Sequence, residues 1–109
     1  MIRARFSPKA ECDLDEHCGH IAADNPDAAA RVRHAILHTA DVLAERPEWG
    51  RRLHQPAPRH APIRWLVVPR FRNYLIFYQP FEDTIMVVRV LHAAQDWTRF
   101  FSAPQSRPT

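Results

Sequence analysis

Three consecutive segments in the second half of the chain are dense in valine, isoleucine and aromatic residues and contain no glycine. They span residues 63–68, 71–79 and 84–92, and only residues 69–70 and 80–83 separate them. β-Branched and aromatic side chains favour strands, and connections this short join antiparallel neighbours. The sequence therefore predicts a three-stranded antiparallel meander, which the rest of the chain must cover.

Both faces of the last of these segments are apolar. Strict alternation places one set of side chains on each face: Ile85, Val87 and Leu91 on one, and Met86, Val88 and Val90 on the other. A strand that is apolar on both faces is covered on both, so we expect this strand to lie centrally in the sheet. Arg89 interrupts the first set and is the conspicuous charged residue.

Two helix start signals precede the strands. Ser7 stands before Pro8 and Asn25 stands before Pro26, so each pair offers a capping side chain and a proline at the first helical position. Apolar residues then recur at helical spacing: Ala10, Leu14, Cys18 and Ile21 after the first signal, and Ala28, Val32, Ala35, Ile36, Thr39, Ala40 and Leu43 after the second. Only a few residues join the two segments, which predicts an antiparallel helix hairpin ending near Glu45.

The remaining segments are shorter. Residues 2–6 alternate apolar and basic side chains, which predicts one strand with a wet face. Residues 46–62 contain four prolines and a glycine, which predicts a loop without an interior helix. Residues 93–101 predict a short last helix, and residues 102–109 a loose tail. The whole predicts a single α+β domain over 1–101, with two layers in which the helix hairpin covers one face of the sheet.

Length and composition restrict the class of protein. A chain of 109 residues holds one domain. Its apolar stretches fall short of the roughly 18 residues that cross a bilayer, and its N-terminus lacks the apolar region of a signal peptide. Cys12 and Cys18 make no disulfide framework. These features predict a cytoplasmic protein with reduced thiols and no membrane association.

The net charge of +3 hides a marked asymmetry. Residues 1–48 carry six basic and nine acidic side chains, whereas residues 49–109 carry nine basic and three acidic ones. This basic second part predicts a surface that meets an anionic partner, either nucleic acid or an acidic protein segment. Fourteen of the fifteen basic residues are arginine, a bias that a GC-rich genome also produces without functional meaning.

The histidines and cysteines of the two helices do not form a metal motif. Zinc takes about four nitrogen or sulfur ligands in a tetrahedron, whereas Cys12 and Cys18 lie on different sides of a helix. Gly19 and Gly50 are the only glycines, and neither begins a phosphate-binding loop. We therefore expect no metal and no cofactor, with His34 and His38 as solvated helix-surface residues.

Basic and aromatic residues accompany the three predicted strands. Arginines interleaved with aromatic rings can grip a phosphodiester backbone and stack bases. In a ribonuclease, Arg89 would stabilise the charge on a pentacoordinate phosphate and His92 would transfer a proton, although no second proton-transfer group lies nearby. The alternative is structural: Arg89 bonds carbonyl groups or Asp96, and His92 caps the strand. The set comprises Arg64, Arg70, Arg72, Arg89 and His92, with Trp65, Phe71, Tyr74 and Tyr78 among them.

The end of the last strand resembles a known family. Arg89-Val90-Leu91-His92, followed by two alanines and then by Asp96, is similar to the ending of ParE-like toxins of the RelE/ParE superfamily, with Gln95 where an arginine is usual. The Ser7-Pro8 opening, the Arg46-Pro47 pair and the Arg72-to-Tyr78 strand also look like that family. The resemblance covers residues 2–101, nearly the whole chain.

This resemblance implies the toxin half of a bacterial type II toxin–antitoxin pair, which a cognate antitoxin binds and neutralises in a hetero-oligomer. ParE-like members inhibit DNA gyrase without cleaving anything, whereas RelE-like members cut mRNA on the ribosome. The scarcity of lysines and carboxylates near the strands favours the gyrase inhibitor over the nuclease. An inactive toxin-fold protein that only binds a partner is a third alternative.

Under these expectations the candidate residues fall into three groups. A nuclease would use Arg64, Arg72, Arg89 and His92. Contacts to the target or to nucleic acid would come from Arg64, Arg70, Arg72, Trp65 and Tyr74. The antitoxin would contact Val32, Ile36, Leu43, Arg70 and Arg72.

Overall fold

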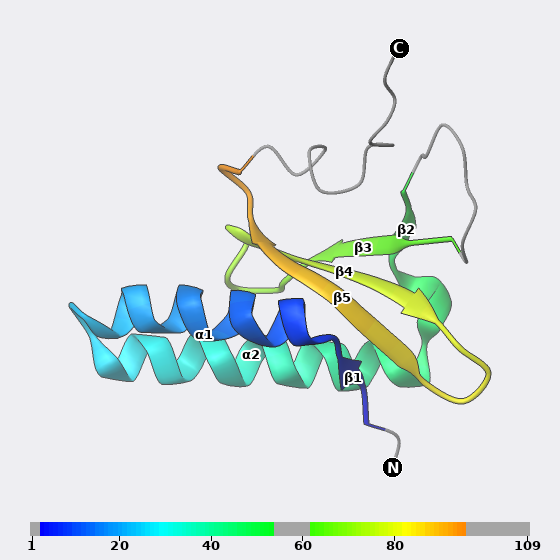
Figure 1. The fold of residues 1–109 in the computed structure, drawn as a ribbon, viewed down its shortest axis with the longest axis horizontal. Coiled ribbons are helices and arrows are strands. Elements are labelled where there is room, and N and C mark those ends of the chain that lie inside the picture. The colour runs from blue at the N-terminus through cyan, green and yellow to red at the C-terminus, as the bar shows by residue number, and fades with distance from the viewer. Residues whose placement is uncertain (1–2, 54–61, 96–109) are drawn as a thin grey trace.

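The fold consists of a five-stranded sheet packed on two antiparallel helices, which is the α+β, two-layer arrangement that the sequence predicts (Figure 1). The computed structural model describes residues 3–53 and 62–95, and the statements below concern those residues. The elements in chain order are β1 (Arg5–Phe6), α1 (Pro8–Ala22), α2 (Pro26–Glu45), the single 3-10 turn η1 (Pro47–Trp49), β2 (Arg51–Arg52), β3 (Arg64–Val67), β4 (Tyr74–Pro80) and β5 (Ile85–His92).

The predicted caps begin both helices. The Ser7 side chain accepts a hydrogen bond from the Ala10 amide at 3.0 Å, and the Asn25 side chain accepts one from the Ala28 amide at 3.1 Å. The predicted apolar stripes face the sheet, where residues such as Leu14 and Ile36 pack against β4 and β5. Burial of these stripes holds the helical layer to the sheet, because most of the stability of a helix in a protein comes from the packing of its apolar face.

The strand order is β1-β5-β4-β3-β2, with β3, β4 and β5 forming the predicted antiparallel meander. β5 lies between β4 and β1, and β1 runs parallel to it. The sequence predicted a strand over residues 2–6. The structure pairs only Arg5 and Phe6 with β5, and Ile2 lies outside the described residues.

The prediction of strict alternation along β5 is wrong, because the strand contains a β-bulge. Tyr78 pairs with Val87 but its neighbour Phe77 pairs with Arg89, so Val88 is an extra residue on β5. The extra residue changes the phase of the strand. Ile85, Val87 and Val90 therefore share the core that faces the helices, whereas Leu91 belongs to a second apolar cluster with Leu75 and Phe77.

The segment predicted as a loop contains η1 and β2, so that prediction is wrong at its start. The cause is a buried tyrosine of β4. The Tyr78 hydroxyl accepts a hydrogen bond from the Gly50 amide and donates one to the Pro47 carbonyl, both at 2.8 Å. Glycine is required here, since a Cβ at position 50 would lie 2.5 Å from the tyrosine oxygen. This anchor holds the segment against the sheet, where Arg51 and Arg52 pair with β3.

Two further segments differ from the prediction. The connection between β3 and β4 extends to Asn73, and Arg70 within it has a positive φ of 73°. Residues 93–95 form a turn and a bend, so the described start of the predicted last helix is not helical. The rest of that helix and the predicted tail lie outside the described residues. In the described part of the chain, no helix has the length and apolarity needed to cross a membrane.

Candidate functional site

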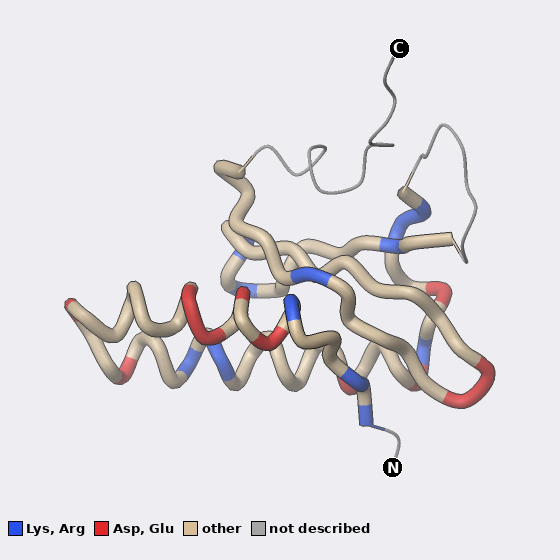
Figure 2. Tube along the Cα trace, in the orientation of Figure 1, with Lys and Arg blue, Asp and Glu red and all other residues tan. Residues whose placement is uncertain are grey.

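Arg89 forms an ion pair with Asp13 of α1. Its Nε and Nη2 atoms donate to the two carboxylate oxygens at 2.7 and 2.8 Å, a two-point geometry, and both side chains are largely buried. The hydrogen bond to Asp13 raises the pKa of Arg89 above its ordinary value, so the guanidinium stays charged. Figure 2 shows acidic positions along α1 beneath the basic position on β5. The sequence predicts carbonyl groups or Asp96 as partners of Arg89; the structure shows Asp13 as a partner, and Asp96 is not among the described residues.

The same helix also bonds backbone groups along the edge of β5 that faces away from β4. Asp13 also accepts a hydrogen bond from the Val90 amide at 3.0 Å, and His17, one turn further on, bonds the Val90 carbonyl through Nε2 at 2.9 Å. Ser7 covers the preceding part of the border, with its amide donating to the Val87 carbonyl and its hydroxyl to the Val88 carbonyl. Beyond β1, side chains thus take the place of a neighbouring strand.

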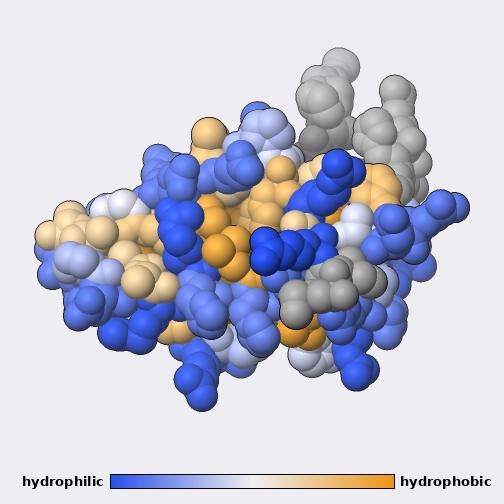
Figure 3. Space-filling model, turned by 90° about the horizontal axis from the view of Figure 1, so that it is seen from below, coloured by the Kyte–Doolittle hydropathy of each residue, from blue (hydrophilic) through white to orange (hydrophobic). Residues whose placement is uncertain are grey.

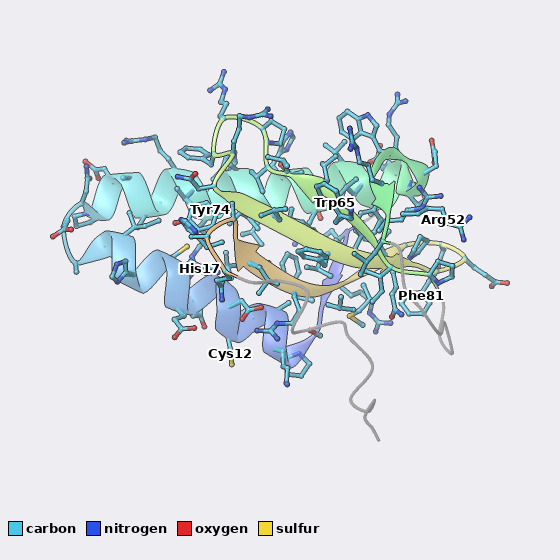
Figure 4. The ribbon with its side chains drawn as sticks, turned by 90° about the horizontal axis from the view of Figure 1, so that it is seen from above. Cys12, His17, Arg52, Trp65, Tyr74 and Phe81 are labelled. Carbon is cyan, nitrogen blue, oxygen red and sulfur yellow. The ribbon has the colours of Figure 1, made fainter. Side chains whose placement is uncertain are left out.

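His92 caps the end of β5. Its amide donates to the Gln95 side chain at 2.7 Å, and its Nδ1 accepts a hydrogen bond from the Ala94 amide at 3.0 Å. A neutral ring therefore carries its proton on Nε2. The ring meets Tyr74 edge-on, with centroids 5.2 Å apart. Tyr74 also meets His17 edge-on, again with centroids 5.2 Å apart, and Figure 4 shows these two residues close together. Burial raises the pKa of Tyr74.

Arg64 and Trp65 lie at the far end of the meander. The Arg64 guanidinium donates to the carbonyls of Gly50 at 2.7 Å and Glu48 at 3.3 Å, so it fastens η1 and β2 to β3. The Arg51 guanidinium lies 5.8 Å from the centre of the Trp65 ring, a cation–π contact. These side chains form a second basic region, separate from His92.

The four residues proposed for a nuclease do not converge. Arg64 pairs with Tyr78 and His92 pairs with Tyr74, four residues along β4, which corresponds to about 13 Å. Figure 4 likewise shows Trp65, the neighbour of Arg64, well separated on the sheet from Tyr74, which pairs with His92. Arg72 is exposed in the β3–β4 turn, and Arg89 turns to α1. No single substrate phosphate could be held by all four.

A groove of about 680 Å³ separates α2 from the β3–β4 turn, with η1 at one end. Its apolar lining includes Val42, Phe71 and Trp49, and Trp49 is 54% exposed. Arg31 and Arg70 lie on its two sides, from α2 and from the turn. On the helical side of the molecule, Figure 3 likewise shows apolar surface surrounded by hydrophilic side chains.

The described histidines and cysteines do not gather into a metal site. Among residues 3–53 and 62–95, no three His, Cys, Asp or Glu side chains come close enough to hold an ion together. Cys18 is buried in the core and burial raises the pKa of its thiol, whereas Cys12 is exposed. His34 and His38 are exposed, with parallel rings 6.2 Å apart.

Comparison with known proteins decides the family. The model of the ParE toxin of the type II toxin-antitoxin system, parDE, matches residues 4–97. This chain belongs to the ParE toxin family. A relative from Sinorhizobium fredii named "Putative toxin Y4kP" is 38% identical over 95 residues, which cover 87% of this chain and 92% of the relative. The solved chromosomal ParDE TA system from P. aeruginosa has the same fold, with a TM-score of 0.63 and 19% identity over 84% of this chain and 96% of that one.

Three residues expected to contact a partner of this ParE-family chain are in its core. Val32 is 3% exposed, and Ile36 and Leu43 are fully buried between the helices and the sheet. Periodicity correctly identifies them as the apolar stripe of α2, but that stripe packs on the chain's own sheet. The exposed residues of the expected antitoxin set are Arg70 and Arg72, in the β3–β4 turn.

Sequence reasoning missed the residues that organise this region. Asp13 and His17 stand beside the apolar stripe of α1, one position before Leu14 and Cys18 respectively. A charged residue at the margin of a buried stripe signals a buried partner, and the conspicuous Arg89 was that partner. Tyr78 and Trp49 gave no comparable signal, because their roles depend on where η1 packs.

Proposed function

We propose that this ParE-family chain is a growth-arresting toxin that inhibits DNA gyrase and that a cognate antitoxin neutralises by direct binding. Membership of the ParE toxin family supports the toxin and its antitoxin partner. One structural observation supports a gyrase inhibitor over a nuclease: two of the candidate catalytic arginines bond groups of the protein itself. The guanidinium of Arg89 bonds Asp13, and that of Arg64 bonds two backbone carbonyls, so both hold the protein together.

Proton transfer also argues against RNA cleavage. Cleavage of a phosphodiester needs one group to take a proton and another to give one, or a single group that does both in turn. His92 has its Nδ1 occupied by the Ala94 amide, and its ring neighbour is Tyr74. Within the described residues the hydrogen bonds and ion pairs of His92 include no carboxylate, lysine or arginine.

A supercoiling assay with purified gyrase tests the proposal. We expect the chain in excess to abolish supercoiling, and addition of the product of the neighbouring reading frame to restore it. Translation in a purified ribosomal system should leave mRNA intact. Full supercoiling at excess toxin, together with mRNA cuts that His92→Ala removes, would establish the ribonuclease instead.

Expression in bacteria distinguishes the third alternative. We expect growth arrest when the chain is produced alone and growth when it is produced with its neighbour. Normal growth at verified levels of folded protein would assign the chain to partner-binding proteins without toxic activity.

A further inference from the structure

The edge of the sheet at β2 is strongly basic. β2 is the last strand in the order of the sheet, and both of its residues, Arg51 and Arg52, are exposed. They begin the arginine-rich run over residues 49–81, which contains six arginines and no aspartate or glutamate. Figure 2 shows basic positions both on β2 and at the start of β3. The positive charge of this edge, called the β2 edge below, is therefore not compensated by any residue of β2 or β3.

The pairing of β2 with β3 distributes this charge over both sides of the edge. Arg51 pairs with Trp65 and Arg52 pairs with Arg64, and residues that pair directly share a face of the sheet. The Arg51 guanidinium lies over the Trp65 ring, and the Arg64 guanidinium is held by two backbone carbonyls. The β2 edge thus carries three guanidinium groups, two of them positioned by contacts within the chain.

The backbone of β2 adds a donor to the same edge. The Leu53 amide bonds the Ile63 carbonyl at 2.7 Å, and bonded and non-bonded pairs alternate along an antiparallel ladder. The neighbouring pair of Arg52 and Arg64 is therefore a non-bonded one, in which the Arg52 amide points away from β3. In Figure 4 the Arg52 side chain also extends outward from the sheet. Arginine side chains and backbone amides are groups that bind phosphate oxygens in protein–DNA complexes.

The absence of an apolar anchor favours a nucleic acid over a protein at this edge. Protein interfaces depend on a few buried apolar or aromatic side chains, whereas phosphate contacts need only charge and hydrogen-bond donors. Among the described residues the exposed large apolar side chains are Leu37, Trp49 and Phe81, and none of them lies on β2 or β3.

We propose that the β2 edge binds the phosphate backbone of double-stranded DNA without sequence preference, and that it contacts the DNA on which gyrase acts. The first part is independent of gyrase, and the second part rests on the proposed function. The contact would add electrostatic affinity for the complex of gyrase with its DNA.

The opposite edge of the sheet provides a comparison within the same molecule. Arg3 and Arg5, in and beside β1, are exposed as well, but Asp83 and Thr84 of the β4–β5 connection line the same hollow. The Asp83 carboxylate offsets part of the positive charge there. DNA should therefore prefer the β2 edge, although both edges carry two exposed arginines.

Fluorescence anisotropy with a labelled DNA duplex of about 20 base pairs tests the β2 edge without gyrase. At about 50 mM salt we expect Arg51→Gln/Arg52→Gln to bind about tenfold more weakly than the unaltered chain, and the slope of log affinity against log salt to be smaller by about 2. Arg51→Lys/Arg52→Lys keeps the charge and should retain that slope. Circular dichroism checks that each variant is folded.

Arg3→Gln/Arg5→Gln is the matched control, because it removes the same charge from the opposite edge. It should bind the duplex within about twofold of the unaltered chain. A duplex that does not bind, or that binds Arg51→Gln/Arg52→Gln as tightly as the unaltered chain, would overturn the proposal. Binding of polyglutamate through these two arginines, without binding of the duplex, would assign the edge to an acidic protein segment instead.

The supercoiling assay tests the second part. We expect Arg51→Gln/Arg52→Gln to require about tenfold more toxin for half-maximal inhibition, because the contact to DNA is lost. Equal potency of the variant and the unaltered chain would overturn the contact to gyrase-held DNA. Failure of the unaltered chain to inhibit gyrase would count against the proposed function itself, whereas binding of the free duplex would still support the β2 edge as a DNA-binding surface.

Discussion

Asp13 and Arg89 lie 76 positions apart in the chain, and their side chains form a two-point ion pair that joins α1 to β5. The carboxylate also accepts a hydrogen bond from the Val90 amide, so one acidic group bonds both the arginine side chain and a backbone group at the edge of β5. The arginine of the family-like motif is thus a structural residue that fixes the helical layer on the sheet.

We expect Asp13→Asn to lower the free energy of unfolding by about 3 kcal/mol, because it removes the carboxylate charge that bonds the mostly buried Arg89 guanidinium at two points. Urea unfolding measures the change. Asp15→Asn is the matched control, since Asp15 pairs with Arg33 on the surface of the same helices and should cost under about 1 kcal/mol. Equal effects of the two substitutions would contradict this role of Asp13.

Tyr78→Phe should destabilise the chain by about 1–3 kcal/mol, because the Gly50 amide and the Pro47 carbonyl both lose their partner. Gly50→Ala should also destabilise it, since its Cβ would meet the tyrosine ring and the Trp65 carbonyl. Thermal unfolding measures both. Because both changes act on one contact, the double variant should lose less than the two single losses added together. Full additivity would show that the anchor is not shared.

Arg70→Gly should move stability and binding in opposite directions. Glycine adopts the positive φ of position 70 without strain, so the folded chain should be as stable as before or more stable by up to about 1 kcal/mol. The same change removes a charge from the rim of the groove, so antitoxin binding should weaken. Unfolding and titration of the one variant test both statements, and a loss of stability would show that the Arg70 side chain has a structural contact of its own.

Alkaline pH should destabilise the chain. Burial raises the pKa of Tyr78 from its ordinary value of 10.0 and that of the Cys18 thiol from 9.0. The unfolded chain therefore loses these protons first, and the free energy of unfolding falls as the pH rises above about 9. Urea unfolding between about pH 7.5 and pH 10.5 measures this fall, which should be smaller in Cys18→Ala than in Cys12→Ala, the exposed control. Identical curves for the two variants would contradict the assignment to Cys18.

Most helices and strands of this fold can be predicted from short stretches of sequence, because the residues that start or favour each element lie within it or directly beside it. A cap followed by proline, as at Ser7 and Asn25, sets a helix start within a few residues, and β-branched runs bounded by turns set the meander. The motif that resembles ParE-like toxins is also a short stretch of sequence, and the match of the ParE toxin model to residues 4–97 confirmed the family.

The errors came from contacts between distant segments. The bulge at Val88 shifts the face of every residue after it, and alternation along β5 alone cannot reveal an inserted residue. The anchor that orders η1 is a tyrosine of β4, 28 positions from Gly50. The Asp13 carboxylate that bonds Arg89 likewise lies on another element, α1, so this ion pair could not be found from the pattern of β5 alone.

The two edges of the sheet prevent strand pairing between copies in different ways. On the β1 side, past the end of that two-residue strand, the β5 amide and carbonyl groups that a foreign strand would need already bond Ser7, Asp13 and His17. At the opposite border, β2 is only two residues long, and both are exposed arginines whose like charges repel a second copy. Within the described part of the chain, a toxin molecule separated from its partner therefore has few strand-edge groups through which copies could pair into fibrils.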